Sequence, residues 1–232
     1  MEKSKYKHSL SIIVPLYNEA ELITHAVDQI CAVVGPRFNN YEIVIVESGS
    51  TDSSAEICKG LALENHHIKL ISEGARNGYG SGLRTGINAA ANDYIWVVTA
   101  DLPFDLSLID TAMQLLDKYF FVLSYRSQDP RSPLRKLQSL IFNLLIKQSF
   151  GLPFKHINSA FRVLPTKFIK NIDLISAGWF IDAEMLYYIK KSGASYIEIP
   201  VPLIDRTHGK STIRVTTFLD VLKEFSRFKK SL

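Results

Sequence analysis

Hydrophobic and polar positions in the first half of the chain alternate between two repeating patterns. Short apolar runs rich in Ile and Val, such as 9–15 and 41–47, are typical of strands buried on both faces of a sheet. Between these runs, apolar residues recur every three or four positions, which predicts helices with one buried side. The predicted strands are 9–15, 41–47, 68–72, 94–99 and 120–125, and the predicted helices are 19–34, about 52–64, 80–91 and 106–117.

The second half of the chain is less regular. Its predicted helices are 134–151, 180–192 and 216–228, and its predicted strands are 159–164 and 196–201. We find no internal repeat and no linker long enough to separate a second domain. Strands that alternate with helices of about a dozen residues imply parallel pairing through right-handed crossovers. The pattern therefore predicts one α/β domain with a mostly parallel central sheet flanked by helices.

Four polar or glycine-rich segments follow the predicted strands. Parallel sheets of this kind bind ligands in the crevice beyond the carboxyl ends of their strands. The loops that reach this edge should therefore form a binding site together. The segments are 15–19, 47–52, 72–80 and 99–105, and the third contains Arg76 among glycines, a setting that favours close approach of an anion.

Composition excludes several classes of protein. With 232 residues, 47% hydrophobic and 22% charged, the chain is neither a disordered nor a collagen-like sequence. Its two cysteines, Cys31 and Cys58, fall in predicted helices and indicate reduced thiols in a cytosolic setting, not a disulfide scaffold. We find neither a secretory signal nor a run of about 18 apolar residues. A net charge of +4 favours anionic partners in general; we expect no nucleic acid among them.

Eight sequence blocks, in order, resemble the inverting glycosyltransferases of family 2, and among them the dolichyl- and polyprenyl-phosphate glycosyltransferases. The resemblance covers about residues 9–212 and implies the GT-A fold, a Rossmann-like nucleotide-diphospho-sugar transferase fold. The blocks are IIVPLYNE at 12–19, VESGSTD at 46–52, GYGSGLRTG at 78–86, TADL at 99–102, SYR at 124–126, NSAFR at 158–162, GWFIDAEM at 178–185 and DRTHGKS at 205–211.

The resemblance implies roles for particular residues and halves of the domain. A nucleotide-binding half would span about 9–126, an acceptor-binding half about 127–215, and an amphipathic helix about 216–230. Asp101 would bind Mg²⁺ or Mn²⁺. The expected substrate-binding residues are Pro15, Tyr17, Glu19, Glu47, Ser48, Arg76, Thr99, Ala100, Arg126 and Lys210, and the expected catalytic residues are Asp101, Arg162, Asp182, Glu184 and Arg206.

Several positions depart from the family pattern. Glu47 and Ser48 stand where two Asp are usual, Thr99 replaces the first carboxylate of the metal motif, and Pro103 replaces a Gln of the mannose-transferring relatives. A divalent cation is held by hard oxygen ligands, so the loss of a carboxylate weakens its binding. We therefore expect weakened metal dependence, with basic side chains such as Arg206 neutralising part of the leaving diphosphate.

The activity expected from the resemblance is transfer of a sugar from a nucleoside diphosphate to an acceptor, with inversion at the anomeric carbon. A polyprenyl phosphate is already an anion, whereas a hydroxyl acceptor needs a general base. Asp182 and Glu184, at i and i+2 of a helix, point to different faces, so only one of them can serve; His156 is more simply a loop histidine. Transfer to a hydroxyl of a surface glycan or lipid-linked sugar, and a non-catalytic nucleotide-binding scaffold, remain the alternatives.

Two basic amphipathic segments, 134–151 and 216–230, suit contact with an anionic bilayer. Helices of this kind can equally cover a sheet, and for the second segment the two interpretations are balanced. The expected location is the cytoplasm, with peripheral contact at the cytoplasmic face of a membrane.

Overall fold

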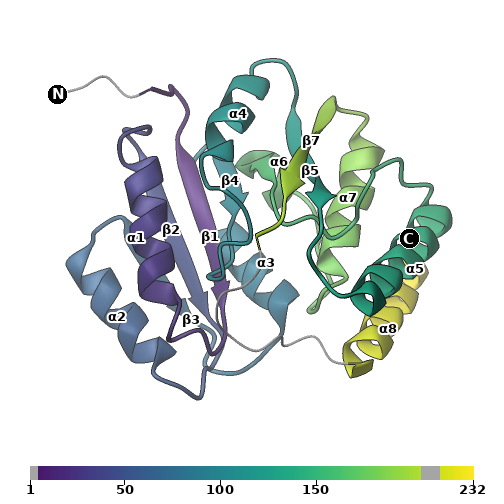
Figure 1. Cartoon of the computed structure of the whole chain (residues 1–232), viewed down its shortest axis with the longest axis horizontal. Helices are drawn as coiled ribbons and strands as arrows, with labels where there is room; N and C mark the ends of the chain where they lie inside the picture. Colours follow the sequence, from purple (N-terminus) through teal and green to yellow (C-terminus); the bar gives the residue numbers. More distant parts are fainter. Residues whose placement is uncertain (1–4, 205–214) are drawn as a thin grey trace.

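The computed structural model describes residues 5–204 and 215–232, and in this part of the chain seven strands form one sheet (Figure 1). The strand order is β3-β2-β1-β4-β6-β5-β7. Neighbours pair in parallel except where β6 meets β4 and β5. The mostly parallel sheet confirms the predicted class. The strands are β1 (Leu10–Leu16), β2 (Tyr41–Glu47), β3 (Ile68–Ser72), β4 (Tyr94–Val97), β5 (Phe121–Gln128), β6 (Val163–Pro165) and β7 (Tyr196–Pro202).

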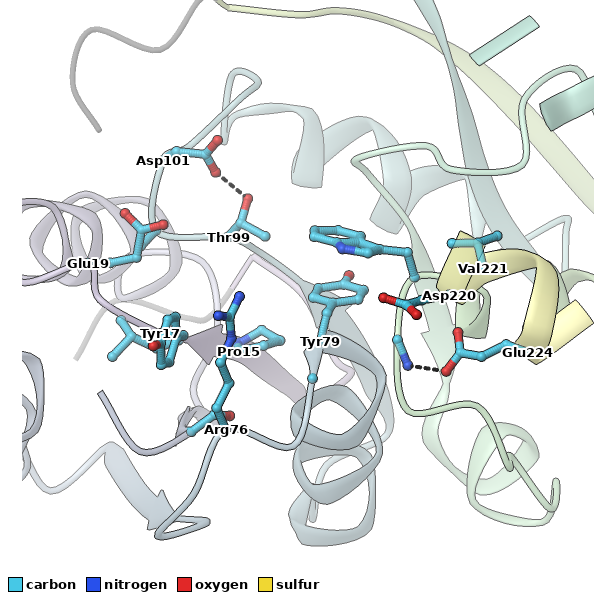
Figure 2. Close-up of a pocket in the computed structure, with 16 residues that line it drawn as sticks. Pro15, Tyr17, Glu19, Arg76, Tyr79, Thr99, Asp101, Asp220, Val221 and Glu224 are labelled. Atoms are coloured by element: carbon cyan, nitrogen blue, oxygen red, sulfur yellow. Dashed lines mark hydrogen bonds between the residues drawn. The ribbon is translucent and has the colours of Figure 1, made fainter. Parts of the chain in front are cut away.

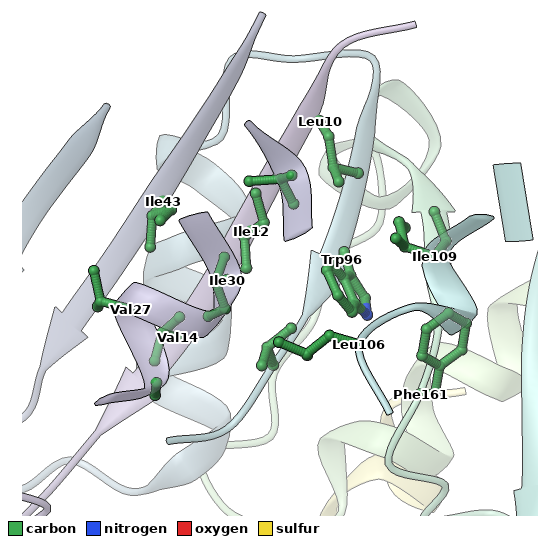
Figure 3. Packing of buried hydrophobic residues seen from close by; sticks show 14 of the residues in the cluster. Leu10, Ile12, Val14, Val27, Ile30, Ile43, Trp96, Leu106, Ile109 and Phe161 are labelled. Atoms are coloured by element: carbon green, nitrogen blue, oxygen red, sulfur yellow. The ribbon is translucent and has the colours of Figure 1, made fainter. Parts of the chain in front are cut away.

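Helices cover both faces of the sheet. The helices are α1 (Ile23–Val34), α2 (Ser54–Glu64), α3 (Tyr79–Ala89), α4 (Leu108–Leu115), α5 (Pro133–Phe150), α6 (Thr166–Lys170), α7 (Ile181–Ser192) and α8 (Val215–Ser231). Side chains of α1, α2 and α4 share one buried cluster, part of which Figure 3 shows, and those of α3 and α5–α8 share another. Within β1, Ile12 belongs to the first cluster and Ile13 to the second, as expected for a strand buried on both faces.

Several element boundaries differ from the sequence prediction for local reasons. Helix α1 begins at Ile23 and not at 19, because Asn18 adopts a φ of 53° and its side-chain oxygen accepts the amide of Thr51. The strand predicted over 159–164 is reduced to β6, since the carbonyl of Ser159 accepts a hydrogen bond from a side chain and not from a strand. Helix α6 was not predicted, because five residues are too few to show a helical period.

The order of the strands creates a switch point in the sheet. From β1 the chain moves outward through β2 to β3, then returns to place β4 on the other side of β1. In doubly wound sheets, ligands bind outside the carboxyl ends of the strands at such a point. The loops that leave β1 and β4 are therefore the first place to look for a site.

Candidate functional site

A pocket of about 300 Å³ opens beside the switch point (Figure 2). Its walls come from the loops after β1, β2, β3 and β4, from the segment before α7, and from α8. Eight of the residues predicted from the sequence line this pocket: Pro15, Tyr17, Glu19, Ser48, Arg76, Thr99, Ala100 and Asp101. The prediction that four loop tips converge at one edge of the sheet is thus met by the geometry.

Tyr17 and Arg76 form one end of the pocket. Tyr17 follows β1 directly, and Arg76 lies in the loop between β3 and α3. The guanidinium carbon of Arg76 lies 4.3 Å from the centre of the Tyr17 ring, a cation–π contact. This end therefore presents a positive charge stacked on an aromatic ring.

Glu47 supports the pocket from behind. It is buried, and its carboxylate accepts the amide of Ser50 at 2.5 Å and the hydroxyl of Ser72 at 3.1 Å. Because these bonds hold the loop after β2 and the end of β3, the structure gives Glu47 a positioning role. The prediction that it contacts substrate directly is not met, since it does not line the pocket.

Glu73, which the sequence prediction missed, plays a similar part. Its carboxylate accepts the hydroxyl of Ser48 at 2.7 Å and those of Ser81 and Thr85 on α3 at 2.9 and 3.0 Å. It therefore ties the loop after β2 to the first turns of α3. No sequence signal separates it from an ordinary acidic loop residue.

Thr99 and Asp101 lie at the edge of the pocket, after β4. The Thr99 hydroxyl donates to the Asp101 carboxylate at 2.5 Å. The hydroxyl that replaces the usual first carboxylate thus bonds to the remaining one. Among the residues placed in the structure, no group of three or more His, Cys, Asp or Glu side chains is arranged to hold a metal ion.

Tyr79 and Trp179 line the other side of the pocket and were not predicted as site residues. Their rings are stacked, with centroids 4.4 Å apart and planes 11° from parallel. Burial raises the pKa of Tyr79 above its ordinary value, so the hydroxyl remains a hydrogen-bond donor well into the alkaline range. The one available signal was their place inside the family blocks 78–86 and 178–185.

Two carboxylates hold the segment 174–180 that carries Trp179. Glu184, fully buried on α7, accepts the amides of Ile175 and Ser176 at 2.7 and 3.0 Å. Glu224 of α8 lines the pocket and accepts the amides of residues 177, 178 and 180 at 2.9, 2.6 and 3.3 Å (Figure 2). Both carboxylate oxygens of Glu184 are thus engaged by backbone amides, which argues against the predicted catalytic role; that role stays a prediction.

The glycines at the start of α3 fit against this segment. A Cβ on Gly78, whose φ is +96°, would lie 2.5 Å from the carbonyl oxygen of Ala177, and one on Gly80 would lie 2.6 Å from that of Gly178. The glycine-rich stretch thus serves close packing of two backbones. Close approach of an anion to this loop, which Arg76 among glycines predicts, stays a prediction.

Arg162 and Asp182 form a buried ion pair that does not line the pocket. The guanidinium Nη1 donates to the Asp182 carboxylate at 2.7 Å, and Nη2 donates to the carbonyl of Ser159. Burial alone would lower the pKa of Arg162, but the Asp182 carboxylate and Tyr79 together raise it. The two side chains are buried against each other, which argues against the catalytic roles predicted for them; those roles stay predictions.

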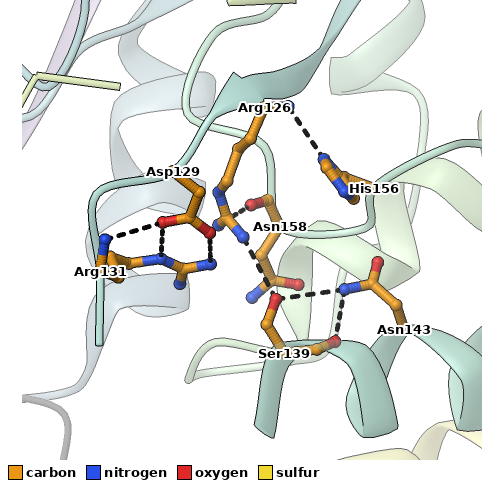
Figure 4. Close-up of polar contacts among 7 residues, drawn as sticks. All are labelled: Arg126, Asp129, Arg131, Ser139, Asn143, His156 and Asn158. Carbon is orange, nitrogen blue, oxygen red and sulfur yellow. Dashed lines mark hydrogen bonds and ion pairs between the residues drawn. The ribbon is translucent and has the colours of Figure 1, made fainter. Parts of the chain in front are cut away.

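Arg126 lies outside the pocket, in a second polar cluster at the end of β5 (Figure 4). It donates to the Ser139 hydroxyl on α5 at 3.2 Å and to the carbonyl of Asn158. Its Nε and the side-chain oxygen of Asn158 are buried without a hydrogen-bond partner among the described residues. Burial lowers the pKa of Arg126 to about 10, which leaves it charged at neutral pH. His156, a loop histidine, accepts the Arg126 amide at 2.9 Å and lies edge-on to the Tyr125 ring.

The remaining sequence predictions fall elsewhere. Arg206 and Lys210 lie outside the described residues. No helix within 5–204 or 215–232 combines the length and the apolar character that a membrane crossing requires. Cys58 is buried and Cys31 half-buried, and neither forms a disulfide.

The sequence was compared with models of known protein families. The model described as Glycosyl transferase family 2 matches residues 11–186. This chain belongs to glycosyl transferase family 2. The match spans β1 to the first half of α7, which includes most of the pocket but not α8.

Curated relatives in the family are longer proteins. The chain is 25% identical over 217 residues to the undecaprenyl-phosphate 4-deoxy-4-formamido-L-arabinose transferase of Edwardsiella ictaluri, covering 92% of this chain and 65% of that protein. It is 29% identical over 105 residues to glycosyltransferase GlyG of Streptococcus pneumoniae, covering 45% of this chain and 34% of that protein. The chain thus spans between a third and two thirds of these two family 2 proteins.

Solved structures show the same fold at low identity. Mannosyl-3-phosphoglycerate synthase from Rubrobacter xylanophilus matches with a TM-score of 0.72 and 17% identity, over 97% of this chain and 76% of that one. Glucosyl-3-phosphoglycerate synthase from Mycobacterium tuberculosis, solved with Mn²⁺, UDP-glucose and phosphoglyceric acid, matches with a TM-score of 0.69 and 15% identity, over 95% and 80%. The GT-A fold predicted for this family 2 member is thereby confirmed.

Proposed function

We propose that this chain transfers a sugar from a nucleoside diphosphate to a polyprenyl phosphate at a membrane surface. The observation that carries the proposal is the pocket, where eight predicted residues from separate loops meet beside the switch point of the sheet. Membership of family 2 and the relatives named undecaprenyl-phosphate sugar transferases support the same reaction class.

The charge of the pocket supports a donor that brings a cation with it. Among its described lining residues, four carry carboxylates and one, Arg76, carries a positive charge. A diphosphate entering such walls needs its charge neutralised. The oxygens near Thr99 and Asp101 are of the hard type that Mg²⁺ and Mn²⁺ prefer, and one or two carboxylates with substrate phosphates are enough for such an ion. Asp101 would therefore hold the ion, which when bound stabilises the leaving diphosphate as a Lewis acid.

Thr99→Asp should make the site bind Mn²⁺ more tightly. The new carboxylate would adjoin Asp101, because the Thr99 hydroxyl already lies 2.5 Å from it. The added carboxylate attracts a divalent ion by about 8 kcal/mol at 4 Å and an effective dielectric of about 20. Lost hydration and repulsion between the two carboxylates offset most of this, so we expect the Mn²⁺ concentration for half-maximal transfer to fall at least about tenfold. Thr99→Ser is the matched control and should keep the original metal response. An unchanged response in Thr99→Asp would show that no metal binds at this point.

The positions of the buried acids favour a phosphate acceptor. Asp182 is engaged by Arg162, and Glu184 by two backbone amides, so neither is placed to deprotonate a hydroxyl. A phosphate needs no base, only positive charge and donors to position it. Arg126 offers both, with one buried N–H that has no partner in the described structure. We assign the acceptor phosphate to the Arg126 cluster.

Helix α5, which borders this cluster, carries apolar residues on its exposed side as well as on its buried side. Its inner side carries Ser139 and Asn143, which bond to each other and to Arg126 or the following loop (Figure 4). Its other side exposes five large apolar residues to between 50% and 65%, namely Leu134, Leu137, Leu140, Ile141 and Leu144. The helix has three basic residues and no acidic one. Such a face fits an anionic bilayer, where the acceptor lipid resides.

Replacing Leu137, Leu140 and Leu144 together by Ser should release the chain from membranes. Each leucine loses apolar area that the bilayer would bury, so we expect vesicle affinity to fall more than about tenfold. Co-sedimentation with phosphatidylcholine vesicles, with and without phosphatidylglycerol, measures it. Leu63→Ser is the control, because Leu63 is 89% exposed on α2, away from α5. Equal binding of the triple variant and the wild type would contradict a membrane role for α5.

Transfer by the purified chain tests the whole function. Radiolabelled UDP-, GDP- and dTDP-sugars are incubated with Mn²⁺ and undecaprenyl phosphate, and label in the lipid phase is counted. We expect one donor to give a lipid-linked product. Label on a hydroxyl glycan acceptor in place of the lipid would establish the hydroxyl-transferase alternative, and absence of both turnover and nucleotide binding would establish the non-catalytic one.

A further inference from the structure

The two ends of the pocket differ in chemistry. Figure 2 places Tyr17 and Arg76 on one side of the pocket, with Asp101 on that side and Thr99 nearer the middle, and it places Asp220 and Glu224 on the other side, beyond Tyr79. A sugar donor is itself linear, with a nucleoside, a diphosphate and a sugar in that order. If the proposed function holds, a nucleoside beside Tyr17 and a diphosphate near Asp101 leave the far end, formed by α8 and the segment 174–180, for the sugar.

Trp179 is the largest side chain at this far end, and its position is fixed. One side of its indole stacks on Tyr79 at 4.4 Å between ring centres. The amides of Gly178 and Phe180, which precede and follow it in the chain, both donate to the Glu224 carboxylate. The ring is half-buried and still lines the pocket. It is therefore a preorganised aromatic surface and not a loose side chain.

An aromatic face with a carboxylate beside it suits a sugar ring. The C–H groups on one face of a pyranose or furanose pack on an aromatic plane, and the hydroxyls at its rim donate to carboxylate oxygens. Asp220 supplies that carboxylate from α8. It is exposed to the pocket, and its contact in the described structure is with Lys223, 3.6 Å away on the same helix. Neither the aromatic face of Trp179 nor the Asp220 carboxylate suits a diphosphate, because a carboxylate repels it.

The geometry points to Trp179 as the platform for the donor sugar, with Asp220 accepting its hydroxyls. This inference rests on the proposed function and deepens it, because it assigns the sugar-recognising end of the pocket. Both residues would determine which sugar is accepted, and neither touches the nucleotide. Helix α8, beyond the family match, would then be part of the substrate site and not only a cover for the sheet.

The test compares each nucleoside diphosphate with its sugar ester in the same variant. Calorimetric titration with UDP and UDP-glucose, GDP and GDP-mannose, and dTDP and dTDP-glucose, all with Mn²⁺, first finds the pair that wild-type protein binds. Trp179→Ala should then weaken the sugar ester about tenfold and the free diphosphate less than about twofold. Trp179→Phe, which keeps an aromatic face, should lose only about threefold on the sugar ester, and Asp220→Asn should also weaken the sugar ester selectively.

Fluorescence gives a second readout without turnover. The chain has two tryptophans, and Trp96 is fully buried in the core, so a change in emission caused by the sugar ester but not by the diphosphate should come from Trp179 and vanish in Trp179→Phe. Equal losses for diphosphate and sugar ester in Trp179→Ala, or no loss in either, would overturn the sugar platform. A selective loss of farnesyl phosphate binding would instead assign the ring to the acceptor. Failure of all three nucleotide pairs to bind wild-type protein would overturn the proposed function itself.

Discussion

Asp101→Asn should lower the rate of sugar transfer by about 10²–10³-fold, because the charge that neutralises the leaving diphosphate is worth several kcal/mol in the transition state. Asp101 is the one carboxylate left of the metal motif, at the edge of the pocket, and the amide of Asn binds a divalent ion far more weakly. Initial rates of transfer to undecaprenyl phosphate at saturating Mn²⁺ measure the effect.

A surface aspartate provides the control for this change. Asp117 is 65% exposed and its ion pair with Lys7 spans 3.9 Å, so Asp117→Asn should leave transfer unchanged. Thermal unfolding of both variants should match the wild type, since neither removes a buried group. Wild-type rates in Asp101→Asn would contradict the assignment of the leaving-group end of the pocket.

Arg162→Met should destabilise the fold by about 3–5 kcal/mol and lower the melting temperature by about 10 °C. It leaves the Asp182 carboxylate buried without a counter-charge, which is the costly way to break an ion pair. Differential scanning calorimetry measures the shift. Arg131→Met is the matched control, because its pair with Asp129 has the same 2.7 Å separation but lies nearer the surface, and should cost about 1 kcal/mol or less.

Removing both charges separates a structural role from a catalytic one. Arg162→Met combined with Asp182→Leu leaves no unpaired charge, so much of the lost stability should return and nucleotide binding should persist. A double variant that is stable and binds the donor, yet shows no transfer, would restore the catalytic assignment that the buried pair now argues against.

The strands and their loop tips could be predicted from the sequence because the signals are local. The Ile- and Val-rich runs of β1 and β2 are typical of strands buried on both faces of a sheet. Parallel pairing of these strands then brings the loops after them to one edge of the sheet. Tyr17, Arg76 and Asp101 followed from that reasoning and meet in the pocket.

The rest of the site depends on contacts between distant parts of the chain. Asp182 and Glu184 were expected in the site because of their sequence block. In the structure Asp182 accepts a hydrogen bond from Arg162, and Glu184 accepts one from an amide before α7. The spacing of residues along a helix does not predict either contact. The Glu224 contact joins α8 to a segment more than 40 residues earlier, and no local pattern announces it. For the same reason the place of Arg126 outside the main pocket could not be predicted, and its role in binding substrate stays a prediction.

A crystal structure of the chain with Mn²⁺ and the nucleotide sugar that binds best is the decisive measurement for the proposed donor site. We expect the nucleoside beside Tyr17 and the diphosphate with its ion at Asp101. A nucleotide bound at any other place on the molecule, or no binding by any of the UDP, GDP and dTDP sugars, would contradict it.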